Sequence, residues 1–266
     1  MRDLLVLLAA GACLAGSAAA DGLFSFGNAR QDSGWGAVGR LEIAGDAFCT
    51  GAMIAPDLVL TAAHCLFDAE TGAPSDVTEM TFLAGWHSGR AAAYRRVRRA
   101  VAHPDYDFSG SDGPGRVPFD IALLELQHPI RNTVIEPFET DLLPEIGDRI
   151  GVVSYMSSHS DAPVLQELCK ILSRQDGYVV MSCQVDFGSS GSPVFSFESG
   201  QPRIVSVVSA MAQSDGAPVS LGTALNDPVA LLKEELAHAR DMAALPGTRS
   251  VRPGDPPATS AKVLRP

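Results

Sequence analysis

The sequence lacks several features that mark whole classes of protein. Among its 266 residues, 20 Lys and Arg stand against 31 Asp and Glu, so the net charge is −11. The lack of a net positive charge argues against a surface built to bind nucleic acid. Gly and Pro, at 25 and 18 residues, show no excess, which excludes collagenous and low-complexity chains. A hydrophobic fraction of 46% and a charged fraction of 19% exclude a mostly disordered chain, and the length predicts one or two domains.

A hydrophobic run long enough to cross a bilayer is missing as well. The apolar run from Leu4 to Ala15 is short for a span of about 20 residues, and small residues follow it up to Ala20. We therefore expect residues 1–20 to be a cleaved signal peptide rather than a membrane anchor, with a secreted or periplasmic product and no stable membrane insertion. Lipidation at Cys13 is an alternative, although no Leu lies three residues before it.

Cysteines are few, and none are arranged as Cys-x-x-Cys. Removing residues 1–20 leaves four cysteines and an unchanged net charge, because one residue of each sign is lost with them. An even number in an exported chain predicts disulfides rather than buried free thiols. Four cysteines allow three pairings, and pairing each local couple, Cys49 with Cys65 and Cys169 with Cys183, is the simplest. Without closer ligand couples we expect no zinc site, and no metal or cofactor is predicted.

Helical periodicity is absent until residue 227, and short strand-like runs separated by turn residues fill the chain before it. The clearest runs are 37–43, 52–54, 58–61, 80–84, 95–102, 121–126, 149–154, 178–183, 193–197 and 203–211. Many strands followed by one helix indicate an all-β fold of antiparallel barrels or a sandwich.

The terminal helix begins near Asp227, with Asn226 or Asp227 as its cap and Pro228 in its first turn. Its predicted apolar face is made of residues 229, 231, 232, 236 and 237. We place the end of the folded domain at about residue 240. The Pro-rich remainder, 241–266, is expected to be a flexible, solvated tail.

Three short motifs carry residues suited to catalysis. Thr61–Cys65 reads Thr-Ala-Ala-His-Cys, so a turn presents His64 next to a cysteine that can tie it to Cys49. Asp120 begins the apolar run Asp120–Leu126, where a half-buried carboxylate can accept the N–H of an imidazole. Each motif alone is more often structural than catalytic.

The third motif, Phe187–Phe195, reads Phe-Gly-Ser-Ser-Gly-Ser-Pro-Val-Phe. A Gly on each side of the central residues allows a sharp turn that aims the Ser190 hydroxyl outward. The backbone N–H groups of Gly188 and Ser190 then point inward as an oxyanion hole. The nucleophile elbow of α/β-hydrolases needs Gly two residues after the serine, where this chain has Ser192.

Taken in the order His64, Asp120, Ser190, the motifs resemble those of the chymotrypsin-like serine peptidases, and Gly-x-Ser-Gly-Ser-Pro is similar to the bacterial glutamyl-endopeptidase-like branch. The resemblance implies two packed six-stranded antiparallel β-barrels followed by a C-terminal helix. We place the peptidase domain at 21–240 and the barrels at about 35–135 and 145–225. The resemblance also implies a Ser-His-Asp triad in the cleft between the barrels and a Cys49–Cys65 disulfide. The pairing of Cys169 with Cys183 is inferred from their isolation.

The chain departs from the animal digestive enzymes of that family. They carry Asp immediately before the nucleophile, to pair with a new α-amino group, whereas this chain has Ser189. We therefore expect that this ion pair does not activate the chain, and that activity requires only removal of the signal or of a short segment, for which Arg30-Gln31 is one candidate processing point. In the glutamate-specific branch a mature N-terminus can lie near the substrate pocket, and Asp186 is a candidate partner for it here.

The resemblance also places the substrate pocket. Gln184 stands six residues before the nucleophile, where a trypsin-type pocket has Asp. Val208 falls where glutamate-specific relatives have His, so no strong preference for Glu is expected. Ser209 and Met211 fall at the substrate backbone and the pocket wall.

The favoured function is an exported serine endopeptidase that acts as a monomer on protein or peptide substrates. The alternative is a catalytically silent binding or regulatory protein on the same fold. Such proteins usually lose a triad residue, and this chain keeps all three. A hydrolase of the Ser-Asp-His order is contradicted by the order of the motifs.

Overall fold

The structure is a computed structural model that describes residues 23–25, 34–43, 47–109 and 113–244. The predicted signal peptide and residues 245–266 of the predicted tail lie outside these ranges. No helix among the described residues is long and apolar enough to cross a membrane.

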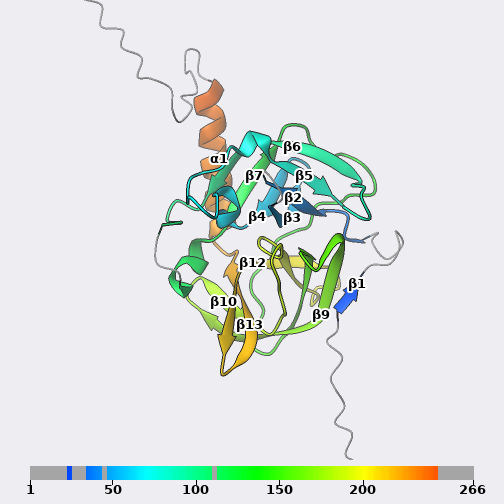
Figure 1. Cartoon of the computed structure of the whole chain (residues 1–266), viewed down its shortest axis with the longest axis vertical. Coiled ribbons are helices and arrows are strands. Elements are labelled where there is room, and N and C mark those ends of the chain that lie inside the picture. The colour runs from blue at the N-terminus through cyan, green and yellow to red at the C-terminus, as the bar shows by residue number, and fades with distance from the viewer. Residues whose placement is uncertain (1–22, 26–33, 44–46, 110–112, 245–266) are drawn as a thin grey trace, which may run out of the picture.

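Six antiparallel strands form a first closed barrel (Figure 1). They run in the order β2-β3-β4-β7-β6-β5. Their bounds are β2 Val38–Glu42, β3 Phe48–Ala55, β4 Leu58–Thr61, β5 Thr81–Ala84, β6 Ala93–Ala102 and β7 Ala122–Leu126. Three 3-10 helices, η2 Ala63–Leu66, η3 Val77–Glu79 and η4 Pro114–Phe119, lie in its connections.

The second barrel follows in the chain and lies below the first in Figure 1. Its strands run β9-β10-β13-β12-β11-β8, and pairing of β8 with β9 closes the ring. Their bounds are β8 Arg149–Met156, β9 His159–Gln175, β10 Tyr178–Met181, β11 Pro193–Ser196, β12 Arg203–Ser214 and β13 Ala217–Ala224. The predicted fold of two six-stranded barrels is confirmed. A further short strand, β1 (Leu23–Ser25), pairs with β9 at residues 164–166.

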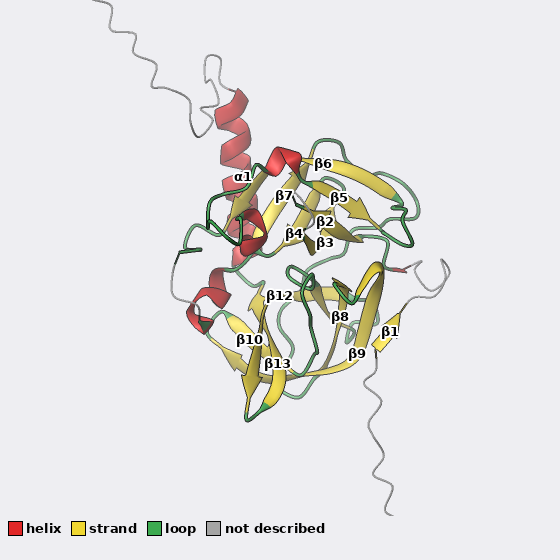
Figure 2. Cartoon of the chain, in the orientation of Figure 1, coloured by secondary structure: helices red, strands yellow, loops and turns green. Residues whose placement is uncertain are grey.

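Helix α1, Pro228–Ala244, packs beside the first barrel against β6 and β7, as Figure 2 shows. Its apolar face buries Val229, Leu232 and Leu236, whereas Ala237, predicted on that face, is exposed. Near its far end Arg240 Nε donates to Glu125 on β7, with 3.1 Å between nitrogen and oxygen. The helix ends four residues after the boundary predicted for the domain at residue 240.

The two barrels share a buried aromatic cluster. Phe195 on β11 meets Trp35, which precedes β2, with ring centroids 4.9 Å apart, and Phe138, from the connection between the barrels, at 4.7 Å. Both are edge-to-face contacts, which aromatic rings favour, and Phe195 is fully buried. This packing fixes the barrels against each other, and with them the loops that face across their junction.

Both predicted disulfides are present. Cys49 on β3 bonds Cys65 in η2, and Cys169 on β9 bonds Cys183, which follows β10. Each bond closes a local loop, of 16 and 14 residues in sequence separation. All four cysteines are buried, so both bonds are built into the barrels rather than placed on the surface.

Replacing either cysteine pair with alanine should lower the free energy of unfolding by about 3 kcal/mol. The reason is that a cross-link over a loop of this length reduces the conformational entropy of the unfolded chain, and the native state is stabilised relative to it. Denaturant unfolding of the two double variants measures the loss. Peptide mapping without reduction provides the control. A peptide that joins Cys49 to Cys169 or Cys183 would contradict the pairing.

Candidate active site

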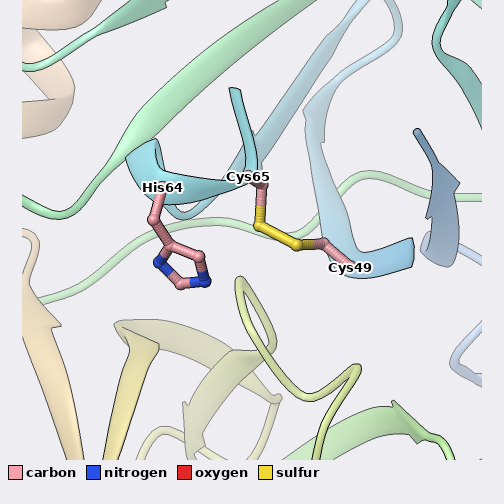
Figure 3. Close-up of side chains that lie close together, drawn as sticks. All are labelled: Cys49, His64 and Cys65. Atoms are coloured by element: carbon pink, nitrogen blue, oxygen red, sulfur yellow. A yellow bond between two sulfur atoms is a disulfide. The ribbon is translucent and has the colours of Figure 1, made fainter. Parts of the chain in front are cut away.

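His64 is presented by a short turn that several contacts hold in place. The strand β4 ends at Thr61, whose Oγ1 donates to the carbonyl of Thr50 on β3 at 2.8 Å. The turn η2 follows at once, and the disulfide to Cys49 ties its Cys65 to the same strand β3. Figure 3 shows the imidazole and the disulfide extending from this one turn. The anchored turn limits the positions that the half-buried His64 ring can occupy.

Cys49, His64 and Cys65 bring potential ligand atoms within 4.8 Å of one another. Metals bind cysteine as the thiolate, and here both sulfur atoms are consumed by the disulfide. The grouping is therefore a covalent anchor beside His64 and not a metal site.

Asp120 is buried beneath His64 at the end of η4. Its Oδ2 lies 2.7 Å from His64 Nδ1, and its Oδ1 accepts from the His64 backbone N–H at 2.9 Å. Ser209 on β12 donates a third hydrogen bond to Oδ2 at 2.5 Å. Because an ionised carboxylate only accepts, these contacts place the imidazole proton on Nδ1 and leave Nε2 free to accept one.

These contacts decide the charge of Asp120. Burial alone raises the pKa of a carboxyl group, but the charge of His64 and the hydrogen bonds from His64 and Ser209 outweigh it. The pKa of Asp120 is thereby lowered below its ordinary value, so the residue remains a carboxylate at neutral pH.

Ser190 lies in the loop between β10 and β11, half-buried at the junction of the barrels. Gly188 and Gly191 on either side have φ angles of +91° and +78°, which residues with a Cβ rarely adopt. A Cβ at Gly191 would also collide with Thr61 and Thr50 of the first barrel. The loop is thus seated against the strand ends that carry the His64 turn.

The two backbone groups predicted as an oxyanion hole have no internal partner. Across the described residues, the N–H groups of Gly188 and Ser190 donate no hydrogen bond, whereas those of Phe187, Ser189 and Gly191 all do. The Ser190 hydroxyl likewise has no hydrogen-bond partner in that part of the chain. The loop therefore presents two donors and one hydroxyl to an incoming ligand.

A cavity of about 510 Å³ opens beside His64 and Asp120. Its walls are mostly apolar and include Phe108, Met211 and Leu221, with Arg116 as its positive charge. A larger cavity of about 650 Å³ lies elsewhere, around residues 133–139 and 201–203, and none of the predicted site residues line it.

The residues predicted for the substrate pocket occupy three different environments. Ser209 lines the cavity beside His64, but its hydroxyl is committed to Asp120. Val208 is 2% exposed and lies behind the nucleophile loop, where its carbonyl accepts from Gly191 N–H at 2.9 Å. Gln184 is exposed, and its backbone N–H donates to the side chain of Gln166 at 2.8 Å. Neither Val208 nor Gln184 lines the cavity beside His64.

Ser189, which precedes the nucleophile, is buried and uncharged. Its Oγ accepts from the backbone N–H of Asp186 at 3.2 Å. The Asp186 carboxylate accepts in turn from Phe187 N–H at 2.7 Å and from the Ser157 hydroxyl at 3.1 Å. The Phe187 hydrogen bond leads the contacts that lower the pKa of Asp186. Asp186 is thus held both by its own turn and by Ser157.

Two roles were not anticipated from the sequence. Ser209 supports Asp120, and Thr50 links the first barrel to the nucleophile loop through its backbone N–H, which donates to the Ser190 carbonyl at 2.8 Å. Thr50 was visible beside Cys49, but nothing in a lone threonine points to such a contact.

Comparison with protein families identifies one model. The model named Trypsin matches residues 25–220, about three quarters of the chain. Among curated proteins, human Serine protease 56 is 33% identical over 104 residues, which is 39% of this chain and 16% of that protein. Glutamyl endopeptidase of Bacillus licheniformis is 27% identical over 197 residues, 70% of this chain and 56% of that protein. The chain thus spans less than two thirds of these relatives' length.

Among solved structures, a Glu endopeptidase in complex with MPD superimposes with a TM-score of 0.64 at 21% identity. The match covers 83% of this chain and 97% of that one. At this identity the likeness concerns the fold alone, that of two antiparallel barrels.

Proposed function

The chain belongs to the trypsin family, and on that premise we propose that it is an exported serine endopeptidase that cleaves peptide bonds through an acyl-enzyme on Ser190. The observation that carries the proposal is the 2.7 Å contact between His64 Nδ1 and a buried, ionised Asp120. This contact leaves Nε2 as a base at the junction where Ser190 lies.

In the proposed reaction, the Ser190 Oγ attacks the scissile carbonyl carbon while His64 Nε2 takes the hydroxyl proton. The carbon–oxygen bond to Ser190 forms as the carbonyl π bond opens onto its oxygen. When the tetrahedral intermediate collapses, His64 returns the proton to the departing amine. Water then attacks the acyl-enzyme by the same sequence. Asp120 orients the imidazole and stabilises the imidazolium without taking its proton.

The negative oxygen of the intermediate is assigned to the N–H groups of Gly188 and Ser190. Both donors lack a partner within the described protein, so they need no hydrogen bond broken before they bind an oxyanion. Donors arranged in advance are worth about 10²- to 10³-fold in kcat each.

The proposed substrate is an extended peptide. Residues 210–214 of β12 pair with β13 on one side, and no described strand pairs with their other edge. Ala210, Met211 and Ala212 on this stretch line the cavity beside His64. A peptide in extended conformation can add main-chain hydrogen bonds along such an edge. The mostly apolar cavity wall suits apolar substrate side chains.

Export completes the proposal. Residues 1–20 have the features of a cleaved signal, and two disulfides suit the oxidising periplasm or medium.

A fluorophosphonate probe tests the activity, because it labels only a serine whose hydroxyl is activated. Labelling of the native chain and none of Ser190→Ala is the expected result. The competing candidate, a silent protein that binds peptides along β12, predicts no labelling of either, together with measurable peptide binding.

Enzymes that begin at Asp21, Gln31 or Ser33 should hydrolyse one ester substrate at rates within about threefold of each other. The reason is that the buried, uncharged Ser189 provides no carboxylate for a new α-amino group. Starts at Gln31 and Ser33 lack β1 and its pairing with β9, so their Tm should be lower by a few degrees. Initial rates and calorimetry measure the two effects. If only one start is active and acetylation of its amine abolishes the activity, the interpretation of Ser189 is wrong.

A further inference from the structure

Thr50, on β3 of the first barrel, makes an unusual set of contacts with the second barrel. Its side chain is fully buried, and Oγ1 donates to the Gly188 carbonyl at 2.9 Å while accepting from the Tyr155 backbone N–H at 3.0 Å. Its backbone N–H donates to the Ser190 carbonyl at 2.8 Å. One residue of the first barrel therefore contacts both residues assigned to the oxyanion hole.

The hydrogen bonds of the nucleophile loop follow a pattern that explains what the Thr50 contacts do. Every carbonyl from residue 187 to 190 accepts a hydrogen bond, from Ser157 N–H, Thr50 Oγ1, Ser192 N–H and Thr50 N–H in that order. Meanwhile the Gly188 and Ser190 N–H groups stay unpaired within the described chain. A peptide plane joins the carbonyl of one residue to the N–H of the next, so Ser157 and Ser192 hold the two planes that carry the free N–H groups, through the Phe187 and Ser189 carbonyls. Thr50 holds the plane that follows each of them, through the Gly188 and Ser190 carbonyls, and so fixes the backbone on the C-terminal side of both donors.

No carboxylate stands immediately before the nucleophile to support the loop. Ser189 is neutral at that position, and within the described residues its hydroxyl takes part in one hydrogen bond, from Asp186 N–H. Gly188 and Gly191 give the loop backbone freedom on both sides of the nucleophile, with φ values of +91° and +78°. A loop with two such glycines and no internal ion pair needs an external support to keep one conformation.

We propose that Thr50 is the positioning residue of the oxyanion hole: its hydroxyl holds the Gly188 carbonyl from across the barrel junction and keeps the loop in its active conformation without an N-terminal ion pair. The proposal rests on the proposed peptidase function. Thr50 touches no reacting atom. Thr50 keeps the loop of most molecules in the active conformation. Removing its hydroxyl lowers the fraction of molecules in that conformation, and the rate falls in proportion to that fraction.

The test compares Thr50→Val, which keeps the shape but removes the hydroxyl, with Thr50→Ser, which keeps the hydroxyl. Thr50→Val should lower kcat by about 10- to 100-fold, less than the loss of an oxyanion donor itself. KM should change by less than about threefold, because the β12 edge is untouched. The affinity of a peptide boronic acid, whose tetrahedral adduct places an oxygen in the oxyanion hole, should fall by the same factor as kcat. Thr50→Ser should restore most of both.

Amide hydrogen exchange of the segment 186–192 gives a readout independent of catalysis, and it should be faster in Thr50→Val than in the native chain. The matched control is Ser206→Ala. This variant also removes a fully buried hydroxyl, one that donates to the Thr223 carbonyl within the second barrel at 2.8 Å. It should affect the Tm without changing kcat or exchange of the segment. If Thr50→Val does not fold, Thr50→Ala replaces it in the same comparison.

Unchanged kcat, boronate affinity and exchange in Thr50→Val would overturn the proposal, as would a loss confined to KM or one that Ser206→Ala reproduces. Failure of the proposed function has a different signature. In that case the native chain is not labelled by fluorophosphonate, and the exchange of segment 186–192 alone decides whether Thr50 orders the loop.

Discussion

Replacing Ser190 or His64 with alanine should each lower kcat for a peptide or ester substrate by about 10⁴- to 10⁶-fold. Ser190 carries the atom that attacks, and His64 is the base that takes its proton, so either loss removes the covalent route. The remaining activity would come from the oxyanion donors and from substrate binding. Because the two residues act as a unit, the double variant should be hardly slower than the singles. Initial rates with a chromogenic ester measure these losses.

The same variants should remain folded. The Ser190 hydroxyl makes no hydrogen bond among the described residues, and the Ser190 carbonyl keeps its bond from Thr50 N–H in Ser190→Ala. In His64→Ala the Asp120 carboxylate loses its 2.7 Å contact but keeps the hydrogen bonds from the residue-64 backbone and from Ser209. Calorimetry should therefore find little change for Ser190→Ala and a loss of about 1 to 3 kcal/mol for His64→Ala.

The neighbouring serines are the controls for this assignment. Ser192 has a buried hydroxyl without a hydrogen-bond partner within the described structure, so Ser192→Ala should be close to neutral in both rate and stability. Ser189→Ala loses one acceptor for Asp186 N–H, and it should be far milder than Ser190→Ala. A Ser189→Ala enzyme no more active than Ser190→Ala would place the nucleophile elsewhere.

The strands with regular apolar patterns were predictable from the sequence, and β9 shows where that reasoning ends. Residues 159–175 form a single strand that passes from the junction of the barrels round the second one. Leu165, Leu168 and Leu172 are spaced as on a helix, yet Leu168 and Leu172 are exposed while Leu165 is buried. Residues 163–166 are buried in succession, and beyond them the two leucines lie on the exposed face of the strand, so the apolar residues do not follow the alternation that a sequence pattern needs.

The candidate active site likewise contains residues that could be predicted from the sequence and residues that could not. His64 and Asp120 lie in motifs whose neighbours constrain them locally, and the structure places their side chains in direct contact. Ser209 and Thr50 act through groups that are 89 and 138 residues away along the chain, Asp120 and Gly188. Such contacts depend on the register of β12 and on the packing of two barrels, which no local pattern records. Gln184 and Val208 were placed by alignment alone, and neither lines the cavity beside His64.

Replacing Asp120 with asparagine should lower kcat by about 10⁴-fold without unfolding the protein. Asparagine has the same shape, and its Oδ1 can keep the hydrogen bond from the His64 backbone, which is 2.9 Å long in the native chain. Its amide nitrogen then takes the place of the oxygen that faces His64 Nδ1. An amide N–H donates, so it favours the imidazole tautomer with its proton on Nε2, and that tautomer cannot accept the proton of Ser190.

The pH dependence provides the check on this explanation. Because its pKa is lowered below the ordinary value of 3.8, Asp120 is ionised throughout the neutral range. The stability that its carboxylate contributes is present above the pKa of the unfolded chain and is lost only as the pH falls through the lower folded value. The carbon NMR signal of the Asp120 carboxyl group should therefore keep the position of a carboxylate from about pH 5 to pH 8. A titration of that signal within this range would show that Asp120 gains a proton there, and would contradict its assignment as the fixed negative partner of His64.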